Sequence, residues 1–401
     1  MIKSKLSEDF LKALNIGKAV GSTEIPINTE AYEYYLRAKY KYAKRQNLED
    51  TEVARGLFQK AIELDETLFQ AKLGLGLSYH YSGDYEKAKD FFEKALNQAD
   101  KIGNDQGVSV SLNNIGIIYF EKGEHDEAMA YHSRSLAIRE ELGDKHGIGV
   151  SLYNIGLIYE RKGEYDKSLD YHTRSLEIKE ELDDKGGRAA SLNSLGIIFD
   201  RKGDYSKALD NFTCSHNLCM ELNDKQTIGY SLNSIGIIHH KKGHYDKSLD
   251  CFIRSLEIKE ELDDKRGRVD SLFNVGIIYY EKGDYKKAGE YLENSITLQN
   301  KIGLKSKELL LGTTTYLFLS HKRLGKEFNS KEIYALVKEV EHLDKEFNFR
   351  LFELLEGKSF LEAAYRQVQE NVNAMENKLK EKFLNYPIPK AIVEAWESIE
   401  K

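Results

Sequence analysis

The sequence predicts an all-α solenoid, a linear stack of antiparallel helix pairs. The stretch from Val108 to Gly303 repeats one pattern five times at a spacing of 40 residues, and a fixed period of this length is typical of stacked supersecondary units. Within each copy, apolar residues recur at helical spacing. No proline occurs between Pro26 and Pro387, and proline disrupts a helix interior at a cost of about 3 kcal/mol.

Each copy of the pattern predicts two helices, as the sequence SLYNIGLIYERKGEYDKSLDYHTRSLEIKEELDDKGG illustrates. The first helix ends near Gly163, where a left-handed conformation is cheap for glycine alone. We expect the second helix to run through the charged segment KEELDDK to Gly186 and Gly187. The apolar stripes of the two helices consist of Leu152, Ile155, Gly156 and Tyr159, and of Tyr165, Leu169, His172, Leu176 and Ile178.

Small residues recur at positions where the two helices of a pair have to approach each other closely. They are Gly156 in the first helix and Ser168 and Ser175 in the second, and the neighbouring copies carry glycine, alanine or serine at the same places.

The order Leu-x-x-Ile-Gly-x-x-Tyr, then Gly-x-Tyr-x-x-Ala/Ser, resembles the tetratricopeptide repeat. The Trp that often opens the family motif is Leu here, and the Pro that often ends the second helix is an acidic residue such as Glu140 or Glu180. Without that Pro the second helix can extend, so the period grows from 34 residues to 40. The long form resembles Pins-type polarity adaptors and kinesin light chains. This resemblance implies a right-handed superhelix that binds extended peptides in its concave groove.

We expect four segments along the chain. Residues 1–29 form an N-terminal helix, near Ser7 to Ile16, and a linker. Residues 30–303 form seven repeats, two of shorter period and then five of 40 residues. Residues 304–345 form a degenerate eighth repeat whose second helix is KEIYALVKEVEHLDKEF. Residues 346–401 form a C-terminal helical cap over the apolar end of the array, with one or two longer helices and a final short helix that carries Trp396.

Composition excludes several classes of partner. The net charge of −7, from 59 basic and 66 acidic residues, provides no broad basic field, so nucleic acid is not expected as a partner. The N-terminal residues are too polar for a signal peptide, and no apolar run approaches the roughly 20 residues of a membrane span. Three cysteines provide no disulfide framework, which fits a reducing compartment. We therefore expect a cytoplasmic protein without a membrane partner.

The sequence contains no phosphate loop, no zinc-type spacing and no nucleophile motif, so we expect no enzyme, cofactor or metal site. A patch rich in histidine and cysteine does not change this expectation, because its members occupy unrelated repeat positions. His132 and His172 replace aromatic residues and are expected in the core. The patch consists of Cys214, His216, Cys219, His239, His240, His244 and Cys251.

The resemblance places the first helices on the inside of the superhelix, and every copy carries an Asn on the stripe expected to face the groove. An amide can donate to and accept from a peptide backbone, and an apolar row beside it supplies contact area. The alternative is that Asn merely tolerates a solvated helix face. The predicted groove residues are Asn113, Asn114, Tyr153, Asn154, Asn193, Asn233 and Asn274, the apolar Ile117, Leu157, Ile197, Ile237 and Ile277, and the basic Arg161, Arg201 and Lys241.

The charges of this stripe predict the kind of peptide. Arg161, Arg201 and Lys241 lie in the middle copies, whereas Glu121 and Glu281 occupy the same place in the outer copies. This pattern favours an extended peptide with acidic residues or a phosphate in its middle.

The sequence thus predicts a non-enzymatic scaffold or adaptor that binds a protein segment in its groove. A second hypothesis is a regulatory arm of a signalling system whose partner is a nucleotide cyclase, a kinase or a transcription regulator. Small-molecule sensing in the groove is a third. Binding of chaperone tails is disfavoured, because the family's carboxylate clamp expects Lys and Asn where this chain has other residues.

Overall fold

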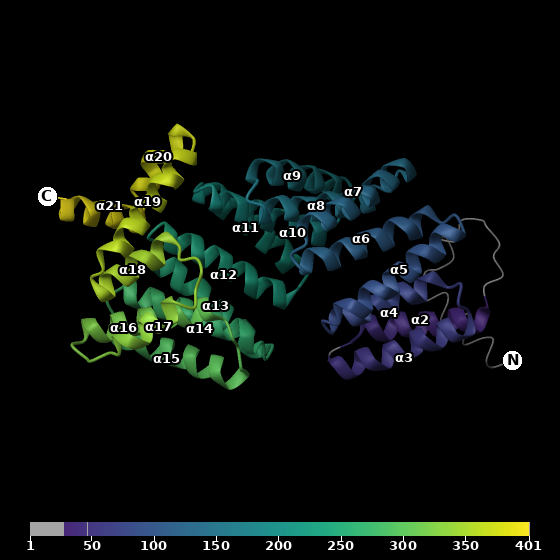
Figure 1. Cartoon of the computed structure of the whole chain (residues 1–401), viewed down its shortest axis with the longest axis horizontal. Coiled ribbons are helices and arrows are strands. Elements are labelled where there is room, and N and C mark those ends of the chain that lie inside the picture. The colour runs from purple at the N-terminus through teal and green to yellow at the C-terminus, as the bar shows by residue number, and fades with distance from the viewer. Residues whose placement is uncertain (1–27, 46, 401) are drawn as a thin grey trace. The chain divides into compact units, whose positions relative to one another are not determined.

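The computed structural model describes residues 28–45 and 47–400 and is built of helices named α2 to α21 (Figure 1). No strand occurs in these residues, which confirms the predicted all-α class. The helix expected near Ser7 to Ile16 lies outside the described residues. In the part of the chain that is described, none of the helices has the length and apolar character needed to cross a membrane.

The chain divides into two compact units, Met1–Gly143 and Asp144–Lys401. The described part of the first unit contains three antiparallel helix pairs, which stack through contacts of α3 with α4 and of α5 with α6. Its helices are α2 (Thr29–Ala43), α3 (Leu48–Leu64), α4 (Phe69–Tyr81), α5 (Tyr85–Lys101), α6 (Asp105–Glu121) and α7 (His125–Leu142).

The second unit contains five further pairs and four C-terminal helices. Its first four pairs are α8 (Lys145–Arg161) with α9 (Tyr165–Glu181), α10 (Lys185–Arg201) with α11 (Tyr205–Glu221), α12 (Lys225–Lys241) with α13 (Tyr245–Glu261), and α14 (Lys265–Glu281) with α15 (Tyr285–Ile302). The remaining helices are α16 (Lys307–Arg323), α17 (Ser330–Val337), α18 (Lys345–Leu355), α19 (Lys358–Ala374), α20 (Asn377–Leu384) and α21 (Pro387–Glu400).

An aspartate cap precedes the first helix of each of the four repeats that start with α8, α10, α12 and α14. The Asp184 side chain accepts a hydrogen bond from the backbone N–H of Gly187 at 2.9 Å, and Asp183 adopts a left-handed φ of 50°. The cap satisfies an N–H that has no partner within the helix. The expectation that the second helix runs to Gly186 and Gly187 is therefore wrong: α9 ends at Glu181, and both glycines belong to the first turn of α10.

Close packing of the two helices in a pair explains the small residues. A Cβ atom on Gly156 would lie 2.8 Å from the ring of His172, so only glycine fits there. The hydroxyl of Ser175 donates to the carbonyl of Gly149 at 2.8 Å, and the same bond recurs one and two repeats further on. The predicted close approach is confirmed, with each serine satisfying its own buried hydroxyl.

The C-terminal part differs from the expectation. Helix α17 ends at Val337 and residues 338–344 are not helical, so the predicted helix through Phe347 is interrupted. The Asp344 side chain caps α18 by accepting from the N–H of Phe347 at 2.9 Å. Three helices, rather than one or two, precede the predicted final helix α21. Their apolar residues share a buried cluster with residues of α10–α13. The C-terminal helices therefore cover inner repeats as well as the end of the array.

Candidate functional site

The predicted binding residues of the second unit lie on its first helices, α8, α10, α12 and α14. We call the surface that carries Tyr153, Asn154, Asn193, Asn233 and Asn274 the first-helix face. Adjacent first helices interact along it: the Asn274 amide donates to the Asn233 carbonyl oxygen at 2.9 Å. Residues 41 positions apart therefore become neighbours on this face.

The predicted residues differ in accessibility. Arg161 and Arg201 are exposed, whereas Ile277 is buried. Most of the other members are half-buried, namely Tyr153, Asn154, Leu157, Asn193, Ile197, Asn233, Ile237, Lys241 and Asn274. The remaining three belong to the first unit, where Asn114 and Ile117 are half-buried and Asn113 is buried.

Two of the predicted residues have packing roles. Tyr153 meets the ring of His172 edge-on, with 5.2 Å between the ring centroids. The ammonium of Lys179, which also belongs to α9, lies 4.4 Å from the centroid of the Tyr153 ring. Asn233 already uses its oxygen to accept from Asn274. A ligand on this face would therefore meet a partly satisfied amide row rather than a free one.

The predicted basic centre has fewer available basic side chains than the sequence suggests. Lys241 forms an ion pair with both carboxylate oxygens of Asp200, at 2.7 and 2.8 Å. Glu160 lies among Arg161 and Arg201; burial raises the pKa of its carboxyl group, and the two guanidinium groups oppose that rise. Arg161 and Arg201 are therefore the exposed cations of this row, whereas Lys241 is half-buried and paired with Asp200.

Helix α18 covers the C-terminal halves of the later first helices, which sequence reasoning did not foresee. Arg350, which is 5% exposed, forms ion pairs with Glu281 of α14 and with Glu353. Glu346 accepts a hydrogen bond from the hydroxyl of Tyr316 on α16 at 2.8 Å. Burial alone would raise the pKa of Glu346, but His240, Arg350 and this hydrogen bond hold it below its usual range. Helix α18 is thus an internal peptide segment bound to the first-helix face.

The helices after α18 contact the start of α11 and the turn between α12 and α13. The ammonium of Lys382 donates to the Ser206 hydroxyl at 2.8 Å, and the rings of Tyr205 and Tyr386 lie 4.7 Å apart. A Cβ atom on Gly243 would lie 2.9 Å from the ring of Pro387. The only sequence signal for this docking is that the repeat pattern decays after Gly303.

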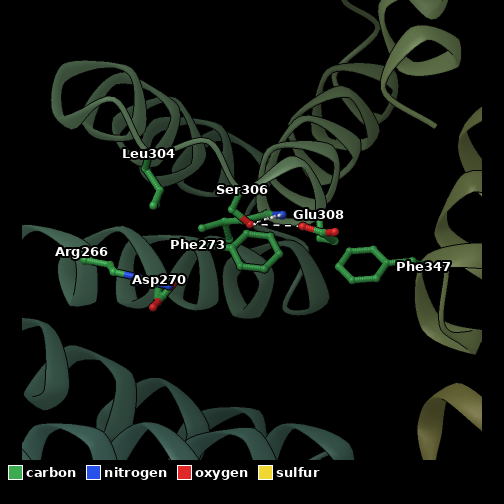
Figure 2. Close-up of a pocket in the computed structure, with 8 residues that line it drawn as sticks. Arg266, Asp270, Phe273, Leu304, Ser306, Glu308 and Phe347 are labelled. Carbon is green, nitrogen blue, oxygen red and sulfur yellow. Dashed lines mark hydrogen bonds between the residues drawn. The ribbon is translucent and has the colours of Figure 1, made fainter. Parts of the chain in front are cut away.

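A pocket of about 300 Å³ opens on the first-helix face beside α18. Figure 2 shows its residues, which come from α14, from the segment between α15 and α16, from the start of α16 and from α18. Ser306 caps α16 by accepting from the N–H of Leu309, and its hydroxyl lies 3.4 Å from the Glu308 carboxylate. The lining consists of Arg266, Asp270, Phe273, Leu304, Ser306, Glu308, Leu309 and Phe347.

The histidine and cysteine patch does not converge. Within the described residues, no group of three or more His, Cys, Asp or Glu side chains is arranged to hold a metal ion. Cys214 is exposed, whereas Cys219 and Cys251 are buried. His132 and His172 are buried against glycines, as expected for core residues.

The family model described as tetratricopeptide repeat matches residues 67–141, 147–221 and 227–301, more than half of the chain. The chain belongs to the tetratricopeptide repeat family. Its fold is accordingly the solenoid that the repeat builds, and the family's general role is protein interaction rather than catalysis.

Solved structures share this tetratricopeptide fold at low sequence identity. The apo form of the quorum sensor NprR from B. thuringiensis is 18% identical, with a TM-score of 0.62, covering 84% of this chain and 93% of that chain. A STAND signal-transduction ATPase with a tetratricopeptide repeat sensor, from Pyrococcus horikoshii, is 16% identical with a TM-score of 0.59, covering 89% of this chain and 55% of that one. A Rap protein complexed with Competence and Sporulation Factor is 16% identical with a TM-score of 0.55, covering 92% and 99%. No curated protein matches the chain.

Proposed function

We propose that this tetratricopeptide protein is a non-catalytic scaffold that binds an extended peptide on the first-helix face of its second unit. The observation that carries the proposal is α18. This face already holds a peptide segment through a buried ion pair between Arg350 and Glu281, a hydrogen bond between Tyr316 and Glu346 and the packing of Phe347 against Gly312. A surface with this chemistry suits a second segment alongside.

The site of the second segment is the part of the face that α18 leaves open. The amides of Asn154, Asn193 and Asn233 are half-buried there, and an amide side chain can pair with the backbone of an extended chain. The half-buried Leu157 and Ile197 add apolar contact area. A Rap protein of this fold is complexed with Competence and Sporulation Factor, which supports a ligand-binding role for such a solenoid.

The exposed Arg161 and Arg201 determine which residues the peptide carries over α8 and α10. Guanidinium groups pair well with carboxylate and phosphate, so an acidic or phosphorylated residue fits at this end. Because Lys241 is engaged by Asp200, the preference is restricted to these two repeats and does not extend over α12.

The first test uses peptides selected by phage display of random dodecapeptides against the full chain. Replacing Asn154, Asn193 and Asn233 together by Ala should weaken the selected peptide at least about tenfold, since each lost hydrogen bond costs roughly 0.5–1.5 kcal/mol. Fluorescence anisotropy with labelled peptide measures the affinity. Replacing Arg161 and Arg201 by Glu should abolish binding of acidic peptides and should not affect binding of other peptides.

The matched control replaces three exposed amides on second helices, Asn97, Asn217 and Asn294, by Ala. This variant loses as many amides but leaves the first-helix face intact, so its affinity should equal that of the unchanged protein. Equal weakening in both triple variants, or none in the first with normal circular dichroism, would contradict the proposed site.

A further inference from the structure

The pocket beside α18 has aromatic and aliphatic walls. Phe273 of α14 and Phe347 of α18 contribute rings, and Leu304 and Leu309 contribute aliphatic side chains. The rings are held from behind, because a Cβ atom on Gly312 would lie 2.7 Å from Phe347 and 3.1 Å from Phe273. The volume of about 300 Å³ is at the lower end for ligand pockets, so it fits one side chain rather than a whole cofactor.

Carboxylates outnumber cations around this pocket (Figure 2). Asp270 and Glu308 line it together with the single cation Arg266. Arg266 precedes Asp270 by one helical turn, yet no ion pair within 4.0 Å joins the two residues in the described structure. Burial raises the pKa of Asp270, and Lys259 and Arg266 only oppose this rise. Among the described residues, Asp270 therefore forms no direct ion pair, although Lys259 and Arg266 are near enough to oppose the rise in the pKa of its carboxyl group.

The first turn of α16 does not turn the pocket into an anion site. The N-terminus of a helix attracts anions through its free N–H groups. Here Ser306 accepts from the N–H of Leu309, and Glu308 places a carboxylate in the first turn. A negatively charged ligand would meet like charge at this position, whereas a cation would be attracted.

We propose that this pocket anchors one apolar side chain of a bound peptide and that Asp270 and Glu308 select a lysine or arginine next to it. The inference rests on the proposed peptide function and specifies the ligand at its α14–α16 end. An apolar side chain fills the space between Phe273 and Phe347, and the neighbouring cation pairs with the carboxylates and with the ring faces.

With this pocket, the first-helix face is basic towards one end and acidic towards the other. Arg161 and Arg201 lie on α8 and α10, whereas Asp270 and Glu308 lie on α14 and α16. A peptide that carries an acidic residue towards one end and an apolar–basic pair towards the other therefore fits in a single orientation.

The experiment titrates the full chain, carrying ¹³C-methyl leucine, with N-acetyl-leucyl-lysine amide as the probe. Saturable shifts are expected for the methyl groups of Leu304 and Leu309. N-acetyl-leucyl-glutamate amide should bind at least about fivefold more weakly, the factor that an interaction of about 1 kcal/mol provides. N-acetyl-glycyl-lysine amide, which has no apolar side chain, should cause no saturable shift.

The double variant Asp270→Asn, Glu308→Gln should remove the preference for the lysine probe while leaving leucine binding in place. A matched control, Glu257→Gln with Glu290→Gln, removes two exposed carboxylates from α13 and α15 and should keep the preference. Equal affinity of the lysine and glutamate probes for the unchanged protein, or no shift with either, would overturn the inference.

The failure of this inference and that of the proposed function can be told apart. A selected dodecapeptide can lose affinity for the variant in which Asn154, Asn193 and Asn233 are replaced by Ala, while the lysine and glutamate probes bind equally to the unchanged protein. In that case the face binds peptides and the pocket assignment is wrong. If the probes bind as expected while replacing Asn154, Asn193 and Asn233 by Ala leaves the dodecapeptide affinity unchanged, the pocket assignment holds and the amide row is not the binding site.

Discussion

His132 and His172 occupy a place in the repeat where three other copies have Phe92, Phe212 or Phe252. His172 packs against Gly156 just as Phe212 packs against Gly196. Neither ring nitrogen of His172 has a hydrogen-bond partner in the described structure. Burial, with a smaller contribution from Lys179, lowers the pKa of His172 to about 4, and burial with Arg139 does the same for His132.

These histidines predict a loss of stability in mild acid. A histidine that is neutral when folded and titrates near 6.5 when unfolded contributes stability above pH 6.5 and loses it as the pH falls towards 4. At pH 5 the loss is about 2 kcal/mol for each histidine. Replacing both by Phe should reduce the difference in urea midpoint between pH 7 and pH 5, measured by circular dichroism.

The unchanged protein serves as the control for the His132→Phe, His172→Phe variant, because the two proteins share every other titrating group. An equal drop in midpoint for the unchanged protein and the His132→Phe, His172→Phe variant would show that the two rings are solvated. The same position carries Phe252 in the sixth repeat, packed against Gly236, so the substitution introduces a ring that this site is known to accept.

At the scale of elements, a buried cation contributes to the attachment of α18 to α14. Replacing Arg350 by Met would leave Glu281, whose side chain is 11% exposed, with only the more distant His240 at 3.9 Å. Breaking a buried pair in this way costs about 3–5 kcal/mol. Chemical unfolding followed by circular dichroism measures the change in the second unit.

The control is Arg254→Met, which removes an exposed ion pair with Asp250 at 3.6 Å within α13. A surface pair of this kind contributes at most about 1 kcal/mol. If both substitutions have the same small effect, α18 does not hold its place through Arg350, and its coverage of the first-helix face has another basis.

The repeat helices could be predicted from the sequence because their determinants are local. The ring of residue 172 and the glycine at 156 lie in one copy, and periodicity exposes such pairs. The end of α9 was missed because Asp184 can be read as a helix residue or as a cap, and its side-chain bond to Gly187 decides the matter. The docking of α18 could not be predicted, because Glu281 and Arg350 are 69 residues apart and belong to no repeating pattern.

The same reason limited the predicted site. The amide row follows the period, so the sequence alone can propose it. The pocket instead depends on Phe347, which reaches the face only after α17 ends and Asp344 starts a new helix. Likewise, the pairing of Lys241 with Asp200 requires the 41-residue offset between neighbouring first helices, which no single copy reveals.

At the scale of the second unit, α18–α21 hide apolar residues of the repeats. Phe273, Ile277 and Tyr280 share a buried cluster with Leu351 and Leu354. A chain ending at Leu343 should therefore associate through this uncovered surface, and light scattering should detect species larger than the monomer. A chain that stays monodisperse and as stable as the full protein would show that the repeats do not need this cover.

The bond between Lys382 and Ser206 spans 176 residues, whereas the serine bonds between the helices of a pair span 26. Contacts of short sequence separation form quickly, and those of long separation form slowly. During synthesis, α10 to α14 can thus fold and stack while the residues that cover them have not yet been translated. The surface that α18 occupies in the finished protein is open during this interval, and any chaperone or partner that recognises it has to act before residue 355 leaves the ribosome.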